Sequence, residues 1–357
     1  MAKVLMKGNE AMALAAIKGG CDAFFGYPIT PQNEVPEYLS KHMKKAGRVF
    51  VQAESEVAAI NMVYGAAGAG ARVLTSSSSP GIALKQEGIS YMAGSELPGV
   101  IINVMRGGPG LGGIQPAQSD YNQITRGGGN GDYKVLSFAP ETLQETVNIV
   151  KESFALADHY RNPVMIAVDG LIGQMMEPVD IDQPVETKPA ATKAWAADGM
   201  YKQRGTRNTI KSLYLDPQHL ENHNLALQAK YQTMEANEQR FELINMDSDP
   251  QIVLVAYGSM ARIARSAIET LKDEGIEVGM LRVISLVPFP QKAFEALSEK
   301  THTLLTLELS LGQMIQDVRL VNNGKRTVEF FGRTGGMVPE SDEIVAKVKS
   351  LLKGASK

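Results

Sequence analysis

The sequence predicts an α/β protein with two doubly wound domains, each built on a parallel sheet. The chain has 357 residues, which exceeds the roughly 100–200 residues of one ordinary domain. Residues 8–170 alternate between helical and strand-like segments, and a second alternation begins at residue 251. Strands in both regions read as continuous apolar runs, as parallel strands covered by helices on both faces do. We therefore place the domains at residues 1–180 and 247–357, with a linker and bridging helix over residues 181–246.

Hydrophobic periodicity and capping residues define the elements of the first domain. Asn9 is expected to open the first helix, and Thr30 followed by Pro31 is expected to cap and start the second. Helices are predicted over residues 8–20, 30–47, 55–70, 81–94 and 141–160. Strands are predicted over residues 21–28, 48–53, 72–77, 99–105, 133–139 and 163–169.

The regular pattern is lost between residues 176 and 216, where we expect a long excursion along the surface. Asp216 and Pro217 then open a polar segment that reads as one helix over residues 217–245. The second domain is predicted to contain strands over residues 251–259, 276–285 and 301–310, and helices over residues 260–275 and 341–353.

Composition excludes several classes of protein. No apolar run approaches the roughly 18 residues of a membrane span, and the N-terminus lacks the apolar core of a secretory signal. The net charge is −3, and lysine and arginine are interspersed with acidic residues and form no basic block. This distribution argues against nucleic-acid binding. Cys21 is the only cysteine, so this chain alone forms no internal disulfide and holds no iron–sulfur cluster. We expect a cytoplasmic protein with no metal site of its own.

The turns that follow strands are where parallel sheets bind ligands. In the first such turn, "FGYPITPQNE", a helix cap at Thr30 would explain only half of the stretch. It leaves open why Tyr27 and Pro28 stiffen the chain just before the cap.

Two acidic residues begin the third predicted helix. Glu54 and Glu56 precede a segment without a charged face, so at least one of them is expected to be buried. Both could instead be surface carboxylates favoured by the helix dipole. A buried carboxylate needs a partner or a raised pKa, and either makes it a candidate for proton chemistry.

Two further turns carry polar chemistry. The stretch "TSSSSPG" presents hydroxyls and free N–H groups to an anion or polar ligand, although Ser79 could simply cap the helix. The stretch "RGGPGLGG" formally matches a dinucleotide fingerprint, but the required helix does not follow. Arg106, at the start of this loop, is placed to bind a carboxylate through two hydrogen bonds.

These motifs, together with "VAYGSMARIA" and "LELSLGQM" further along, give the chain a resemblance to a known family. It resembles the α subunit of the 2-oxoacid:ferredoxin oxidoreductases over nearly its whole length. The similarity is greatest to the branched-chain type that acts on 2-oxoisovalerate (3-methyl-2-oxobutanoate), with the 2-oxoglutarate type as the alternative.

The resemblance implies a thiamine diphosphate pyrimidine-binding domain followed by a domain like the C-terminal domain of transketolases. It implies that Glu56 holds the N1′ atom of the aminopyrimidine, with Glu54 as the alternative. Thr30 and Arg106 would face the substrate, the hydroxyl of Thr30 near the reactive carbon and Arg106 on the 2-oxoacid carboxylate. The implied cofactor-binding residues are Glu56, Pro28, Ile29, Ser78, Ser79 and Gly81.

The resemblance also implies partner chains. The G-D-G…N motif that holds the diphosphate and Mg²⁺ is not matched, and no C-x-x-C is present. We therefore expect a chain that is inactive alone and needs a β subunit for the diphosphate and Mg²⁺. A cluster-bearing subunit and a γ subunit would complete the complex, which uses CoA and passes electrons to ferredoxin. Alternatives are a subunit of a lipoamide-linked 2-oxoacid dehydrogenase or transketolase relative, and a non-catalytic α/β scaffold.

Overall fold

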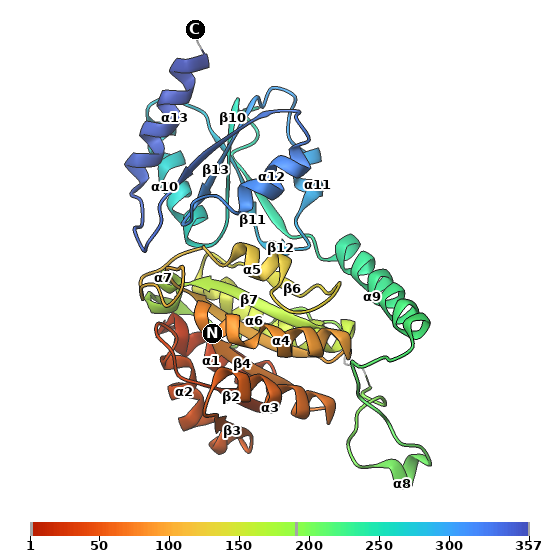
Figure 1. The fold of residues 1–357 in the computed structure, drawn as a ribbon. Helices are drawn as coiled ribbons and strands as arrows, with labels where there is room; N and C mark the ends of the chain where they lie inside the picture. The colour runs from red at the N-terminus through yellow and green to blue at the C-terminus, as the bar shows by residue number, and fades with distance from the viewer. Residues whose placement is uncertain (1–2, 190–191, 356–357) are drawn as a thin grey trace.

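The protein consists of two α/β units, one above the other in Figure 1, in a computed structural model that describes residues 3–189 and 192–355. The first unit runs from red to yellow, the second is cyan to blue, and α9 (Pro217–Asn237) lies beside both. Each unit has its own sheet with helices on both faces. The predicted fold class is confirmed.

The first sheet has seven strands in the order β12-β6-β7-β5-β4-β2-β3 and is parallel except for β12. Its strands are β2 (Ala23–Gly26), β3 (Val49–Gln52), β4 (Val73–Ser77), β5 (Gly99–Met105), β6 (Leu136–Phe138), β7 (Pro163–Asp169) and β12 (Ser285–Val287). The accompanying helices are α1 (Gly8–Lys18), α2 (Glu34–His42), α3 (Glu56–Gly68), α4 (Ser79–Gly94), α5 (Tyr121–Arg126), α6 (Leu143–Tyr160) and α7 (Gly170–Gln174), with a 3-10 turn at Lys44–Ala46. A separate antiparallel pair joins β1 (Val4–Lys7) to β8 (Met176–Val179).

The second sheet has five strands in the order β14-β13-β10-β11-β9, and only β9 is antiparallel to its neighbour among the described strands of this sheet. Its strands are β9 (Phe241–Ile244), β10 (Ile252–Ala256), β11 (Gly279–Val283), β13 (Thr303–Glu308) and β14 (Thr327–Gly332). Its helices are α10 (Gly258–Asp273), α11 (Gln291–Glu295), α12 (Met314–Asn322) and α13 (Ser341–Ala355).

The two units share strands and a core. The short strand β12 follows residue 247 in the chain but pairs with β6 of the first sheet. One hydrophobic core runs from α3 and α4 on the first sheet into one face of the second sheet. The buried Gln118 adds polar contacts across the junction, because its side chain donates to Tyr257 O (2.8 Å) and accepts from Leu309 N (3.0 Å). The two units are therefore joined through a packed junction.

The structure corrects the expected end of the bridging helix. Asp216 caps α9 as predicted, accepting from His219 N at 3.0 Å. The helix ends at Asn237, however, and the residues expected to continue it form β9 at the edge of the second sheet. Phe241 and Leu243 pack against the shared core from this strand, and burial of these side chains outweighs the helical pattern.

Two predicted helix caps are also wrong. The first helix is preceded by Lys7, and Asn9 lies inside it, where Nδ2 donates to Pro31 O at 2.7 Å. The second helix begins at Glu34 instead of at Thr30. The carbonyl of Pro31 accepts from Asn9 and from Gln174 Nε2 (2.8 Å), so residues 30 and 31 belong to a turn held by its neighbours.

The excursion expected over residues 176–216 begins later than predicted, because residues 176–179 form β8 and pair with β1. Its described part from residue 180 onward contains only one short helix, α8 (Tyr201–Arg204). Figure 1 shows this green segment extending away from the first sheet before the chain returns to α9. Among the described residues, no helix combines the length and apolar character needed to cross a bilayer.

Candidate active site

Glu56 is the first residue of α3, and the fold buries it. Ser55 caps the helix by accepting from Ala58 N at 3.1 Å. The side chain of Glu56 is 6% exposed, whereas Glu54 is exposed. The expectation that one of the two carboxylates is buried is confirmed, and the structure selects Glu56. Within residues 3–189 and 192–355, no group donates a hydrogen bond to its carboxylate.

Glu56 was expected to be buried because the helix that follows it has no charged face, and this explanation is wrong. Helix α3 is not buried on all sides, because Val57 and Met62 are 43% and 36% exposed. Glu56 is buried because α3 packs against α4 at this end. Burial of the carboxylate therefore follows from the contact between two helices.

Gly81 allows the close approach of Glu56 to α4. A Cβ at position 81 would lie 2.7 Å from Oε1 of Glu56 and 2.1 Å from Oγ of Ser77. A Cβ atom essentially never comes within 3.0 Å of another heavy atom in this way, so every residue larger than glycine would displace one of these groups. The Glu56 carboxylate and the Ser77 hydroxyl thus converge on the backbone of the first turn of α4.

The serine-rich turn offers unpaired hydroxyls. Ser78, and not Ser79, is the N-cap of α4, and it makes no side-chain cap bond. The hydroxyls of Ser77 and Ser78 are buried with no hydrogen-bond partner among the described residues. Buried polar groups are normally satisfied, so these two hydroxyls indicate a place prepared for a polar ligand.

Arg106 joins two loops. Its side chain is 6% exposed and donates from Nη1 to Thr30 O (2.8 Å) and from Nη2 to Leu111 O (2.9 Å), while Nε is buried without a partner. Its backbone N–H donates to Oγ of Ser79 at 3.0 Å. The guanidinium therefore ties the turn at Thr30 to the glycine-rich loop.

Thr30 contacts Arg106 through its carbonyl and not through its hydroxyl. The half-buried side chain lines a pocket of about 290 Å³ with Asn33, Gln115 and Gln174, among others. The same turn carries two of the predicted cofactor-binding residues. Pro28 is exposed and Ile29 is half-buried.

The first turn of α4 brings the predicted residues together. Ser79 bonds the backbone of Arg106, and two residues later Gly81 lies under Glu56. Arg106 in turn holds Thr30. The turns after β2, β3, β4 and β5 thus meet at one edge of the sheet, as the carboxyl ends of parallel strands must.

Asp120 is a buried group that the sequence did not single out. It accepts from Asn103 Nδ2 at 2.9 Å, and burial raises the pKa of its carboxyl above the usual value. Hydrogen bonds from Ser79 and Asn103, together with the charge of Arg106, oppose that rise. Nothing in the residues around Asp120 marks it, because the loop that carries it has no regular period.

Lys85 was also missed, although a signal was present. It lies three residues after Ile82 and four before Ile89, on the buried face of α4, and it is 0% exposed. Its Nζ donates to Thr75 Oγ1 at 3.0 Å. Burial lowers the pKa of Lys85 from 10.5 to about 8, and the charge of Glu56 partly opposes this shift.

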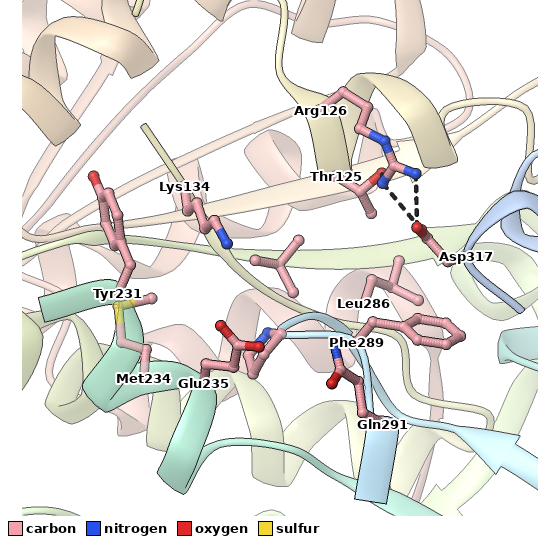
Figure 2. Close-up of a pocket in the computed structure, with 12 residues that line it drawn as sticks. Thr125, Arg126, Lys134, Tyr231, Met234, Glu235, Leu286, Phe289, Gln291 and Asp317 are labelled. Carbon is pink, nitrogen blue, oxygen red and sulfur yellow. Dashed lines mark hydrogen bonds and ion pairs between the residues drawn. The ribbon is translucent and has the colours of Figure 1, made fainter. Parts of the chain in front are cut away.

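A separate pocket lies away from these residues. Figure 2 shows it between α5, α9 and β12, with a volume of about 160 Å³ and with none of the predicted site residues in its lining. Arg126 and Asp317 form an ion pair at its edge (2.7 Å). In the described part of the chain, no three His, Cys, Asp or Glu side chains are grouped to hold a metal ion.

Family models match both units. The model described as "Pyruvate flavodoxin/ferredoxin oxidoreductase, thiamine diP-bdg" matches residues 14–247. The model described as "Pyruvate:ferredoxin oxidoreductase core domain II" matches residues 251–344.

Relatives match over the full length. The ketoisovalerate oxidoreductase subunit VorB of Methanothermobacter thermautotrophicus is 48% identical over 357 residues, which are 100% of both chains. The 2-oxoglutarate synthase subunit KorA of Archaeoglobus fulgidus is 35% identical over 333 residues, 92% of this chain and 94% of that protein.

Solved structures of other enzymes share the fold of this chain. A 2-oxoglutarate:ferredoxin oxidoreductase from Magnetococcus marinus, with 2-oxoglutarate, coenzyme A and succinyl-CoA bound, has a TM-score of 0.88 and 25% identity. The match covers 98% of this chain and 65% of that one, so this chain spans about two thirds of that chain's length. A split gene transketolase, an inactive beta4 tetramer, shares the fold at a TM-score of 0.59 and 15% identity, with 98% of both chains covered. The chain belongs to the pyruvate flavodoxin/ferredoxin oxidoreductase family of thiamine diphosphate-binding proteins.

Proposed function

We propose that this chain is the α subunit of a 2-oxoacid:ferredoxin oxidoreductase that oxidatively decarboxylates 2-oxoisovalerate to its acyl-CoA and passes the electrons to ferredoxin. Support for this substrate comes from relatives named for ketoisovalerate, which are 48% and 47% identical. Relatives named for 2-oxoglutarate reach 31–35%. The lipoamide-linked and transketolase alternatives have less support, because the transketolase likeness extends to the fold alone.

The observation that carries the proposal is the carboxylate of Glu56, which has no hydrogen-bond donor among the described residues. The side chain is 6% exposed. Its oxygens are not among the fully buried unpaired polar atoms of the described residues, so they keep a narrow opening through which a ligand can donate a hydrogen bond. A protonated nitrogen on an aromatic ring can donate this hydrogen bond.

The residues present fit the aminopyrimidine of thiamine diphosphate. Gly81 lets the Glu56 carboxylate and the Ser77 hydroxyl come together against the backbone of α4, since a Cβ there would displace both. The unpaired hydroxyls of Ser77 and Ser78 add polar partners beside it. When bound, thiamine diphosphate supplies the nucleophilic carbon and the electron sink for decarboxylation of a 2-oxoacid.

Glu56 holds a proton at N1′ of the ring on this proposal. The start of α3 and the packing of α4 fix the position of its carboxylate, so little reorganisation is needed when a proton moves between oxygen and nitrogen. Burial excludes water, which would otherwise compete for that proton. Glu54 is exposed and does not have this environment.

Arg106 and Thr30 bind the 2-oxoacid on this proposal. Arg106 has a buried Nε without a partner, and each of its Nη atoms uses only one of two N–H groups on a carbonyl. A substrate carboxylate can accept from the remaining N–H groups. Thr30 lines a pocket of its own and is bonded to Arg106 through its carbonyl, and on this proposal its hydroxyl meets the same ligand.

The proposal includes partners. A β subunit holds the diphosphate and Mg²⁺, because this sequence has no G-D-G…N motif. A cluster-bearing subunit accepts the electrons and a γ subunit completes the complex, because the single cysteine cannot bind a cluster. We place the complex in the cytoplasm.

Replacement of Glu56 by Gln in the assembled complex tests the proposal. Gln keeps the shape but cannot exchange a proton, so the reduction of ferredoxin should fall about 10²–10⁴-fold, the usual contribution of a positioned acid–base group. Glu54→Gln is the matched control and should retain activity. Full activity of the E56Q complex would overturn the role of Glu56.

Substrate preference needs its own test. Values of kcat/KM for 2-oxoisovalerate, 2-oxoglutarate and pyruvate should be measured with the same preparation and with ferredoxin as acceptor. The proposal expects the highest value for 2-oxoisovalerate. A higher value for 2-oxoglutarate would retain the family and reject the substrate.

A further inference from the structure

Lys85 is an unusual lysine. Its side chain is 0% exposed inside the α/β core, and it donates one hydrogen bond, to the neutral Thr75 Oγ1 at 3.0 Å. No carboxylate in the described residues comes within ion-pair distance of its Nζ. Lysine is almost never fully buried unless it is paired, so stability does not explain its presence.

A residue of the same length without charge would fit this place at lower cost. Methionine fills irregular gaps in cores and needs no hydrogen bond. Replacing a buried charge by a well-packed apolar residue is often neutral or stabilising. The presence of a lysine therefore calls for a role that methionine cannot fill.

The position of Lys85 indicates that role. It lies four residues after Gly81 on α4, one helical turn further into the core, and Gly81 is the residue on which the Glu56 carboxylate packs. Among the described residues, the charge of Glu56 opposes the lowering of the Lys85 pKa that burial causes. Lys85 and the glycine that contacts the Glu56 carboxylate thus lie one turn apart on α4, without a direct ion pair between the two charges.

Other ionisable groups on the elements around Lys85 are engaged elsewhere. On α3, the Tyr64 hydroxyl bonds the Ser95 hydroxyl at 2.8 Å. At the end of β7, Asp169 accepts from Ser259 Oγ at 2.7 Å. On α4 itself, Glu87 accepts from the Tyr91 hydroxyl at 2.7 Å.

We propose that Lys85 is a positioning residue whose buried ammonium supplies the counter-charge for Glu56 and so sets how readily Glu56 shares its proton with the ring nitrogen of the cofactor. This inference rests on the proposed function. A positive charge behind the carboxylate stabilises its ionised form and favours release of the proton toward the ring. Lys85 does not touch the cofactor and transfers no proton itself.

Cofactor binding to the assembled complex tests the proposal without turnover. The ligands are thiamine diphosphate with Mg²⁺ and an analogue in which carbon replaces the N1′ nitrogen, and calorimetry gives Kd for each. The Kd of the analogue divided by the Kd of thiamine diphosphate reports the interaction between Glu56 and the ring nitrogen. The wild-type complex should bind thiamine diphosphate more tightly than the analogue.

Lys85→Met should reduce this ratio about tenfold, equivalent to a change of one pKa unit in the sharing of the proton. Because Glu56→Gln removes the same interaction, adding K85M to E56Q should change the ratio no further. Lys230→Met is the matched control, since Lys230 is a largely buried lysine whose charge acts on Glu96 instead. It should leave the ratio unchanged.

Each result has a distinct meaning. Equal loss of affinity for both ligands in K85M would show that Lys85 only shapes the pocket and would overturn the inference. An unchanged ratio in E56Q would instead overturn the proposed function. If K85M failed to assemble, Thr75→Val would replace it. Loss of the Thr75 hydroxyl removes the hydrogen-bond acceptor of the Lys85 ammonium and disfavours its charged form, so the ratio should fall as in K85M. An unaffected ratio in T75V would then reject the proposal.

Discussion

Glu56 and Gly81 are in such close contact that a Cβ on Gly81 would lie 2.7 Å from Oε1 of the glutamate. This contact couples the start of α3 to the first turn of α4. It fixes a carboxylate at the point where the cofactor ring is proposed to bind, and it makes position 81 sensitive to the smallest change in size.

Gly81→Ala should therefore weaken binding of thiamine diphosphate. The added methyl group displaces the Glu56 carboxylate or the Ser77 hydroxyl, and we expect Kd to rise at least about tenfold, since misplacement by about 1 Å can cost 10²-fold in function. Calorimetric titration of the assembled complex measures the change. Gly94→Ala, at the far end of the same helix, meets only an ordinary contact of 3.5 Å with Ser212 and should bind normally.

Arg106→Lys should raise KM for the 2-oxoacid about tenfold or more. Arg106 reaches the carbonyls of Thr30 and Leu111 at once with two separate nitrogens, and the single ammonium of lysine cannot span both. Steady-state kinetics give KM, and limited proteolysis of the glycine-rich loop reports its loosening. Arg262→Lys, in an exposed single ion pair with Glu177, is the control. An unaltered KM in R106K would remove Arg106 from the substrate site.

The stability contribution of Lys85 should depend on pH. The fold lowers its pKa from 10.5 to about 8, so between these values the unfolded chain keeps a proton that the folded chain has released. Stability then rises with pH across this window, because the cost of burying the ammonium disappears as Lys85 becomes neutral. K85M lacks that cost at every pH. It should be more stable than the wild type by on the order of 3 kcal/mol near pH 7, and the difference should shrink toward pH 10.

Denaturant unfolding of both complexes across this pH range measures the difference. Titration of the other lysines affects both proteins alike and cancels. A stability difference that stayed constant from pH 7 to pH 10 would contradict the lowered pKa.

Gln118→Leu should destabilise the junction between the two units. The substitution leaves the N–H of Leu309 buried and unpaired, at a cost of about 1–3 kcal/mol, and leaves the carbonyl of Tyr257 with only the long bond from Ala261 N (3.4 Å). Thermal unfolding should show a clearly lower midpoint. Gln218→Leu, on the exposed face of α9, should change the midpoint little. A wild-type midpoint in Q118L would mean that the junction does not depend on this residue.

The sequence by itself determined the alternation of strands and helices within each unit and the two-unit α/β architecture. Apolar runs such as "GVIINVM" and "PVMIAVD" are long enough and continuous enough to identify buried parallel strands, because only those strands are covered on both faces. The motifs at the ends of such strands also identified the family, which the full-length relatives confirm.

The tertiary structure decided what local pattern leaves open. The residues after Asn237 have helical character but join a sheet, since burial of Phe241 and Leu243 outweighs local preference. The choice of Glu56 over Glu54 was left open by propensity, because both suit a helix start and only the packing of α4 covers one of them. Lys85 comes under the influence of the Glu56 charge in the same way, because α4 packs against α3. The order of residues along the chain does not encode this contact between helices.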